Sequence, residues 1–140
     1  MYRSLKIAVV IPAFNESLHI GKTVESVPAY VDHIVIVDDG SCDETASLAA
    51  KAEPRKTEVI RHETNRGVGA AIATGYKHAL QLDVDAAVVI GADGQMEPSE
   101  MTDILNPLID EQADYVKGNR FGHPDVFKHM PLVRFLGTAT

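Results

Sequence analysis

The chain has 140 residues, of which 45% are hydrophobic and 24% are charged. This composition predicts one soluble globular domain, because domains typically have about 100 to 150 residues and disordered chains contain fewer apolar residues. Lys and Arg number 13 against 20 Asp and Glu, and the net charge of −7 argues against a nucleic-acid-binding protein, while the single cysteine, Cys42, excludes an internal disulfide bond and a multi-cysteine zinc site.

Five short apolar segments, most of them rich in Val and Ile, recur along the chain. They are typical of strands buried on both faces, and the stretches between them are long enough for crossover helices. This alternation predicts a β-α-β-α-β-α-β-α-β order and a mostly parallel sheet with helices on both faces. No segment reaches the ~18 apolar residues of a membrane helix. The predicted strands are Lys6–Ile11, His33–Asp38, Thr57–His62, Ala86–Gly91 and Ala113–Asn119.

The predicted helices carry start and stop signals. Ser41 and Glu44 fit a capping box that opens the second helix, and Pro98 suits the first turn of the fourth. Pro107 is expected to kink or shorten that helix near residues 105–106, because proline lacks the N–H that continues a helix. Beyond the fifth strand the periodicity fades, so we expect an incomplete region and a fragment of a longer gene product.

Polar residues cluster directly after each predicted strand. In an open parallel sheet, ligands bind outside the carboxyl ends of the strands, and all these clusters lie at that edge. Five loops that are distant in sequence are therefore predicted to converge on one site. The five loops are Pro12–Glu16, Asp38–Ser41, Asn65–Gly69, Asp93–Gln95 and Gly118–Arg120.

Asp38 and Asp39 close the second predicted strand. Two adjacent carboxylates repel unless each faces a donor or a cation. Because strand side chains alternate in direction, one could accept hydrogen bonds from the following turn while the other points at a ligand. The alternative is that both only cap the loop and the helix that follows.

Asp93 and Gln95 lie two residues apart, so in an extended segment their oxygens project to one side. They could share a hard cation such as Mg²⁺ or Mn²⁺, which would neutralise charge on a departing nucleoside diphosphate. The alternative is a tight turn built on Asp93 and Gly94.

Asn65–Gly69 supplies two glycines at a predicted helix start, where free backbone N–H groups favour an anion. The alternative is that they only allow a tight turn, and the segment is neither a dinucleotide fingerprint nor a Walker motif. Arg120 could place a forked cation over phosphate oxygens, or be a paired surface charge. The histidines show no metal-ligand spacing, and we expect His62 and His78 on the surfaces of their elements.

With these clusters identified, the sequence resembles the N-terminal part of family 2 glycosyltransferases with the GT-A (Rossmann-like) fold, particularly the polyprenyl-phosphate (dolichyl-phosphate) mannosyl- or glucosyltransferase branch. The resemblance covers nearly the whole chain in the family's order, which makes it much more specific than any single motif. It rests on VVIPAFNES (9–17), IVIVDDGSCDET (34–45), NRGVGAAIATGY (65–76), ADGQMEP (92–98) and YVKGNRF (115–121).

The resemblance implies a nucleotide-diphosphate sugar donor, GDP-mannose or UDP-glucose, and a polyprenyl phosphate or another glycan or lipid acceptor. Asp93 and Gln95 match the metal and diphosphate positions for Mg²⁺ or Mn²⁺, and Arg120 matches a phosphate-binding arginine, so Asp93 and Arg120 are the candidate catalytic residues. Gly69 falls in the turn that approaches the donor, and Asp38 would organise its loop or touch the ribose. The base and ribose would lie near Pro12, Ala13, Asn15, Glu16 and Asp39.

One departure from the family pattern concerns the metal. The first aspartate of the D-x-D-x-Q pattern falls on Gly91, which should weaken metal affinity and leave the diphosphate and waters to complete the coordination. A general base would lie beyond this chain, but a polyprenyl phosphate already has an anionic attacking oxygen. The implied reaction is an inverting displacement at the anomeric carbon, with the metal and Arg120 stabilising charge on the phosphates.

The implied domain organisation is a nucleotide-sugar-binding core over residues 1–120 and the incomplete start of an acceptor-side region over 121–140. We expect a cytoplasmic protein that meets the cytoplasmic face of a membrane only peripherally, through sequence beyond this chain. Two alternatives stay open: a nucleotide-sugar-binding module without transferase activity, and a phospho-receiver domain. The second fits less well, because a receiver's acid pair should close the first strand rather than the second.

Overall fold

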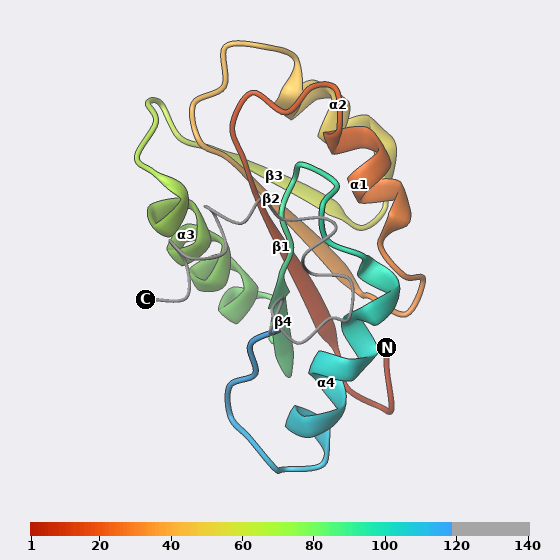
Figure 1. The fold of residues 1–140 in the computed structure, drawn as a ribbon. Coiled ribbons are helices and arrows are strands. Elements are labelled where there is room, and N and C mark those ends of the chain that lie inside the picture. Colours follow the sequence, from red (N-terminus) through yellow and green to blue (C-terminus); the bar gives the residue numbers. More distant parts are fainter. Residues whose placement is uncertain (119–140) are drawn as a thin grey trace, which may run out of the picture. The chain divides into compact units, whose positions relative to one another are not determined.

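The computed structural model describes residues 1–118, in which four strands form one parallel sheet with the order β3-β2-β1-β4 (Figure 1). The central strand β1 pairs with β2 from Ala8 opposite His33 to Ala13 opposite Asp38, and with β4 on its other side. This position suits the apolar run Ile7–Ile11, which is fully buried. The strands are β1 (Ile7–Ala13), β2 (His33–Asp38), β3 (Thr57–Arg61) and β4 (Ala86–Val89).

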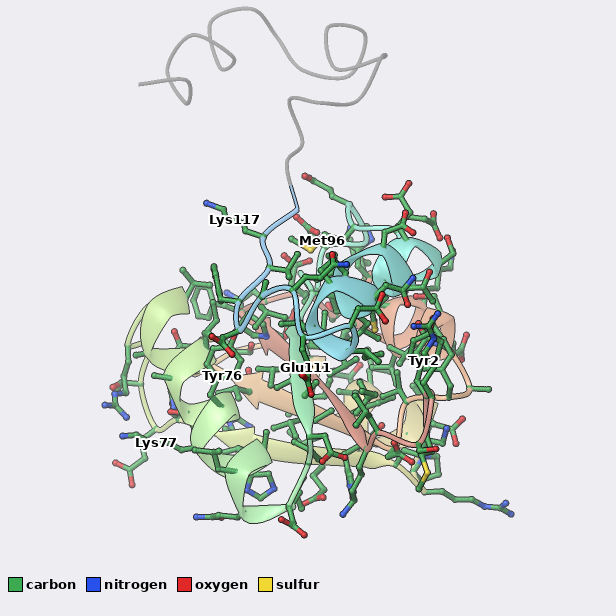
Figure 2. The ribbon with its side chains drawn as sticks, turned by 90° about the horizontal axis from the view of Figure 1, so that it is seen from below. Tyr2, Tyr76, Lys77, Met96, Glu111 and Lys117 are labelled. Carbon is green, nitrogen blue, oxygen red and sulfur yellow. The ribbon has the colours of Figure 1, made fainter. Side chains whose placement is uncertain are left out.

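Three helices connect these strands: α1 (Ile20–Ser26), α2 (Thr45–Ala52) and α3 (Val68–Gln81). Helix α3 covers one face of the sheet, while α1 and α2 lie side by side on the other face (Figure 1). Ala71 of α3 joins Val10, Val35 and Val37 in a buried cluster, whereas Lys77 projects away from the sheet (Figure 2). The expected parallel sheet with helices on both faces is therefore confirmed.

The first four predicted strands are confirmed to within two residues at each end, and the fifth is not. Residues 113–118 form no strand, and Asn119 lies outside the described residues. The prediction assumed a segment buried on both faces, but Tyr115 in its middle is 75% exposed. The amide of Ala113 instead donates to the carbonyl of Pro107, at 3.2 Å.

The sheet and its three helices lie within Met1–Asp103, one of two compact units into which the chain divides, and α4 (Met101–Ile109) runs across the boundary. A short 3₁₀ helix, η1 (Pro98–Glu100), leads into α4, so Pro98 begins η1 and not the first turn of α4, where it was predicted. The predicted shortening of α4 near residues 105–106 is wrong, because the helix continues through Pro107 to Ile109, and the alternative of a kink there stays a prediction. Within residues 1–118, no helix has both the length and the apolar character needed to cross a membrane.

Candidate functional site

The loops that follow β1, β2, β3 and β4 all emerge at one edge of the sheet (Figure 1). Parallel strands end at a common edge, so segments that are far apart in sequence meet there. Four of the five predicted loops are thus brought to the same edge of the Met1–Asp103 unit. The fifth ends in Arg120, which lies outside the described residues, and its role stays a prediction.

The first loop is fastened onto the second by hydrogen bonds. The amide of Asn15 donates to Ser41 Oγ at 2.9 Å, and Asn15 Oδ1 accepts from the amide of Cys42, also at 2.9 Å. The amide of Glu16 donates to Thr45 Oγ1 at 2.9 Å. Asn15 has a φ of 53°, a left-handed conformation that asparagine tolerates better than most residues. Asn15 is exposed, and it shapes the edge through its hydrogen bonds to the second loop.

The predicted capping box is wrong, because Glu44 and not Ser41 occupies the N-cap position of α2, and the Glu44 side chain makes no capping hydrogen bond. The helix begins at Thr45, and its first amide donates to Asp43 Oδ1 at 3.0 Å. The hydrogen bond from the Thr45 hydroxyl is the largest influence that lowers the pKa of Asp43 to about 2. The Ser41 hydroxyl instead accepts a hydrogen bond from the amide of Asn15 in the first loop.

Asp38 is fully buried and organises the turn that follows it, as the sequence predicted for one of the two aspartates. Its Oδ1 accepts from the amide of Ser41 at 3.1 Å. Its Oδ2 lies 3.3 Å from Arg61 Nε in an ion pair without hydrogen-bond geometry. Arg61 also donates to the carbonyl of Ser41 at 2.6 Å, so it ties both ends of this turn to β3.

Asp39 turns toward the third loop and is only 3% exposed. Its Oδ1 accepts from the amide of Arg66 at 2.9 Å, and its Oδ2 accepts from the amide of Gly67 at 2.8 Å. Burial alone would raise the pKa of Asp39, but the Arg66 amide, the His62 ring and the Gly67 amide together hold it below its ordinary value. Both aspartates thus make bonds within the protein.

The prediction that His62 lies on a surface is wrong, because its side chain is buried. Only 7% of the residue is exposed, with Nδ1 at 2.6 Å from Asp39 Oδ1 and Nε2 at 2.9 Å from Thr74 Oγ1 in α3. Strand alternation was the available signal, because His62 follows the exposed Arg61 and so faces the opposite side. His78 is half-buried and lies 2.8 Å from Glu58 Oε2.

A hollow of about 220 Å³, which we call the rim hollow, opens among the first three loops and the start of α3. Its walls are mainly apolar with one carboxylate, a composition that suits a flat heterocycle with a polar edge. Gly69 follows in the first turn of α3, and a Cβ there would meet nothing within 4 Å. The rim hollow is lined by Pro12, Ala13, Phe14, Asp39, Asn65, Val68 and Ala71.

The fourth loop forms a tight turn at Asp93 and Gly94, which was the alternative to a metal site in the sequence analysis. Asp93 Oδ1 accepts from the amide of Gln95 at 3.0 Å, and Gly94 has a φ of 71°. A Cβ at Gly91 would lie 3.0 Å from Asp93 Oδ1, so position 91 is close to this carboxylate. The turn occupies one of the two carboxylate oxygens and leaves Asp93 exposed.

The donor set of this loop is small for a metal site. No group of three or more His, Cys, Asp or Glu side chains in the described part of the chain is placed to hold a metal ion. Asp93 and Gln95 offer one carboxylate and one amide oxygen, which are hard ligands of the kind that Mg²⁺ and Mn²⁺ take. These residues fit a metal only if a bound diphosphate and waters complete the coordination.

Comparisons with known proteins agree with this architecture. The model of the family described as Glycosyl transferase family 2 matches residues 8–138. The UDP-N-acetylglucosamine–dolichyl-phosphate N-acetylglucosaminyltransferase of Methanococcus voltae is 37% identical over an alignment of 146 residues, gaps included, and the match covers 94% of this chain and 58% of the relative. The polyprenol monophosphomannose synthase of Mycolicibacterium smegmatis is 32% identical over 139 residues, which cover 94% of this chain and 51% of the relative.

A solved structure shares the fold. The crystal structure of glucosyl-3-phosphoglycerate synthase from Mycobacterium tuberculosis, in complex with Mn²⁺, UDP and glucosyl-3-phosphoglycerate, matches with a TM-score of 0.59 and 26% identity. The match covers 75% of this chain and 40% of that one. The chain spans about half the length of the curated relatives it matches.

Proposed function

The chain belongs to glycosyl transferase family 2, and from that premise we propose that it binds a nucleotide-diphosphate sugar at the carboxyl edge of its sheet and serves hexosyl transfer to a polyprenyl phosphate. The observation that carries this proposal is the rim hollow, an apolar slot with one carboxylate at the edge where α/β sheets bind ligands. Family membership also excludes the phospho-receiver alternative.

The comparisons support the classes of donor and acceptor. The two curated relatives are named for dolichyl phosphate and polyprenol, which supports a polyprenyl phosphate acceptor. The solved structure that shares the fold contains UDP and Mn²⁺, which supports a nucleotide donor and a divalent cation. GDP-mannose and UDP-glucose both stay candidate donors.

Each loop has a proposed task in donor binding. The base and ribose occupy the rim hollow beside Pro12 and Ala13, where Asp39 fixes the far wall through the third loop. The diphosphate reaches the fourth loop, where Asp93 and Gln95 would hold Mg²⁺ or Mn²⁺. When bound, the cation supplies charge neutralisation on the departing nucleoside diphosphate.

The acceptor's chemistry makes a general base unnecessary. An oxygen of the polyprenyl phosphate forms the new bond to the anomeric carbon while the bond from that carbon to the diphosphate breaks, which inverts the configuration. The attacking oxygen is already anionic, so no proton needs to move. We assign Arg120 to the phosphate charge, residues 1–120 to the donor core and residues 121–140 to the start of the acceptor side, at the cytoplasmic face of a membrane.

Calorimetric titration of UDP and GDP with and without Mn²⁺ tests the donor site, with Asp93→Asn as the decisive variant. Asparagine keeps the oxygen that accepts from the Gln95 amide but loses the charge, so the turn survives while metal affinity falls. We expect Mn²⁺ to lower the Kd of the parent for the nucleotide. In the presence of Mn²⁺, the Kd of Asp93→Asn should be about tenfold or more above that of the parent.

The matched control is Asp83→Asn, the same change at another exposed aspartate. It should leave both titrations unchanged. An Asp93→Asn variant that binds nucleotide and Mn²⁺ as well as the parent would contradict the proposed metal position.

A second candidate function is a nucleotide-sugar-binding module without transferase activity, and Gly91 favours it. This residue stands where the family pattern has its first aspartate, so the loop carries one carboxylate instead of two. Radiolabelled sugar transfer to a polyprenyl phosphate separates the two functions. Metal-dependent nucleotide binding without transfer would support the module, and transfer would exclude it.

A further inference from the structure

His62 is a buried imidazole at the donor site that the proposed reaction does not use. Its Nδ1 lies 2.6 Å from Asp39 Oδ1, and its Nε2 lies 2.9 Å from Thr74 Oγ1. We propose that His62 is a positioning residue that fixes the Asp39 carboxylate, so that the turn at residues 65–67 forms one wall of the rim hollow. Of the measurements that test this proposal, only the nucleotide affinity rests on the proposed function.

The direction of the hydrogen bonds follows from the charge on Asp39. The pKa of this carboxyl is below its ordinary value, because the Arg66 amide, the His62 ring and the Gly67 amide outweigh the effect of burial, so it is ionised at neutral pH. An ionised carboxylate only accepts hydrogen bonds, so the proton between the two groups belongs to His62 Nδ1. Nε2 lies within hydrogen-bond distance of the Thr74 hydroxyl, so both ring nitrogens have a partner.

The ring and the third loop share the same carboxylate. Asp39 Oδ1 accepts hydrogen bonds from His62 Nδ1 and from the Arg66 amide, and Oδ2 accepts one from the Gly67 amide. Removing the ring leaves a buried carboxylate with one donor fewer and a void beside it. Because a buried charge is costly unless it is bonded, the carboxylate would then turn toward solvent and release the two amides.

The released amides belong to the wall of the rim hollow. Arg66 and Gly67 lie between Asn65 and Val68, and both of those residues line the hollow. A change at His62 therefore reaches the nucleotide through Asp39 and this turn. Thr74 in α3 does not line the rim hollow, and its hydroxyl fixes the orientation of the His62 ring through Nε2.

The test uses the 140-residue chain, nitrogen-15 NMR of the histidine rings and amide hydrogen exchange. We expect His62 to carry a proton on Nδ1. In His62→Leu, the Arg66 and Gly67 amides should exchange about tenfold faster, and the Kd for UDP or GDP should rise about tenfold. His62→Asn, whose side-chain N–H can replace the Nδ1 donor, should stay within about threefold of the parent in both measurements.

The matched control is His78→Leu, because His78 also pairs with a carboxylate, at 2.8 Å from Glu58 Oε2, but belongs to the last turn of α3. It should leave the exchange of Arg66 and Gly67 and the nucleotide affinity unchanged. Equal losses in both leucine variants would overturn the proposal, as would unchanged exchange of the two amides in His62→Leu.

The ring itself gives a result that needs no variant. A parent ring that carries its proton on Nε2 and none on Nδ1 would overturn the proposal even if His62→Leu does not fold. If the parent binds neither UDP nor GDP, the proposed function fails, while the ring tautomer and the amide exchange still decide the role of His62.

Discussion

Asp38 and Asp39 are neighbours in sequence but stabilise different loops. Asp38 accepts a hydrogen bond from the amide of Ser41 in its own loop. Asp39 accepts hydrogen bonds from two backbone amides of the third loop. Strand alternation predicted that the two carboxylates would face different groups. It could not predict which group Asp39 faces, because that contact joins segments about 27 residues apart and depends on how the loops pack.

Gly40 determines how closely the second and third loops approach each other. It has a φ of 78°, and a Cβ there would lie 2.7 Å from the amide nitrogen of Asn65 and 2.8 Å from the carbonyl carbon of Thr64. Both contacts are to backbone, so no side-chain rotation relieves them. We expect Gly40→Ala to lower the free energy of unfolding by about 2 to 4 kcal/mol, measured by urea denaturation.

The control for this substitution is Gly21→Ala in α1, where a Cβ would meet nothing within 4 Å. Alanine favours the helix over glycine, so stability should stay the same or rise slightly. A Gly40→Ala protein as stable as the parent would show that the third loop can move aside without cost.

At the scale of elements, the sequence predicted most of the architecture and failed where a partner is required. The first four strands were predictable because each contains a short run with Val or Ile, and β1 and β2 are buried along almost their whole length. The segment 113–118 is weaker as a strand, because Val116 is its only β-branched residue, and the amide of Ala113 donates back to the carbonyl of Pro107. Strand alternation indicated that His62 faces away from the exposed Arg61, but its partner Thr74 could not be predicted, because that contact depends on how α3 packs.

The packing of α3 on β1 depends on Gly75. A Cβ at this position would lie 2.2 Å from Val10 Cγ1, and the fully buried Val10 is β-branched and cannot turn away easily. Gly75→Ala should therefore push the helix off the strand and cost about 1 to 3 kcal/mol of unfolding free energy in urea denaturation. Shortening the opposing side chain with Val10→Ala should recover part of the loss in the double variant.

Gly69→Ala is the control on the same helix, because a Cβ there would meet nothing within 4 Å. It should raise stability by about 0.5 to 1 kcal/mol through helix propensity alone. If Gly75→Ala behaved like Gly69→Ala, the close approach of α3 to β1 would not contribute to stability.

At the scale of the whole molecule, three aspartates with lowered pKa values should make the folded state less stable as the pH falls into the acid range. Asp32, Asp39 and Asp43 all have lowered pKa values, with Asp43 at about 2 against an ordinary value of 3.8. Burial alone would raise the first two, but amide and charged donors outweigh it, and the Thr45 hydroxyl dominates at Asp43. The folded state therefore binds fewer protons than the unfolded state in acid, and folding is favoured above the ordinary pKa.

The melting temperature should therefore be nearly constant down to about pH 5, fall once the pH drops below about 4, and continue to fall toward pH 2 as the folded carboxyls take up protons. Asp43→Asn tests the sign directly, because asparagine can still accept from the Thr45 amide but cannot titrate. Its melting temperature should fall less steeply than the parent's between pH 4 and pH 2 in calorimetric scans. An equal slope in parent and variant would mean that Asp43 titrates alike in the folded and unfolded chains, so that its bonds to Thr45 do not favour the charged form.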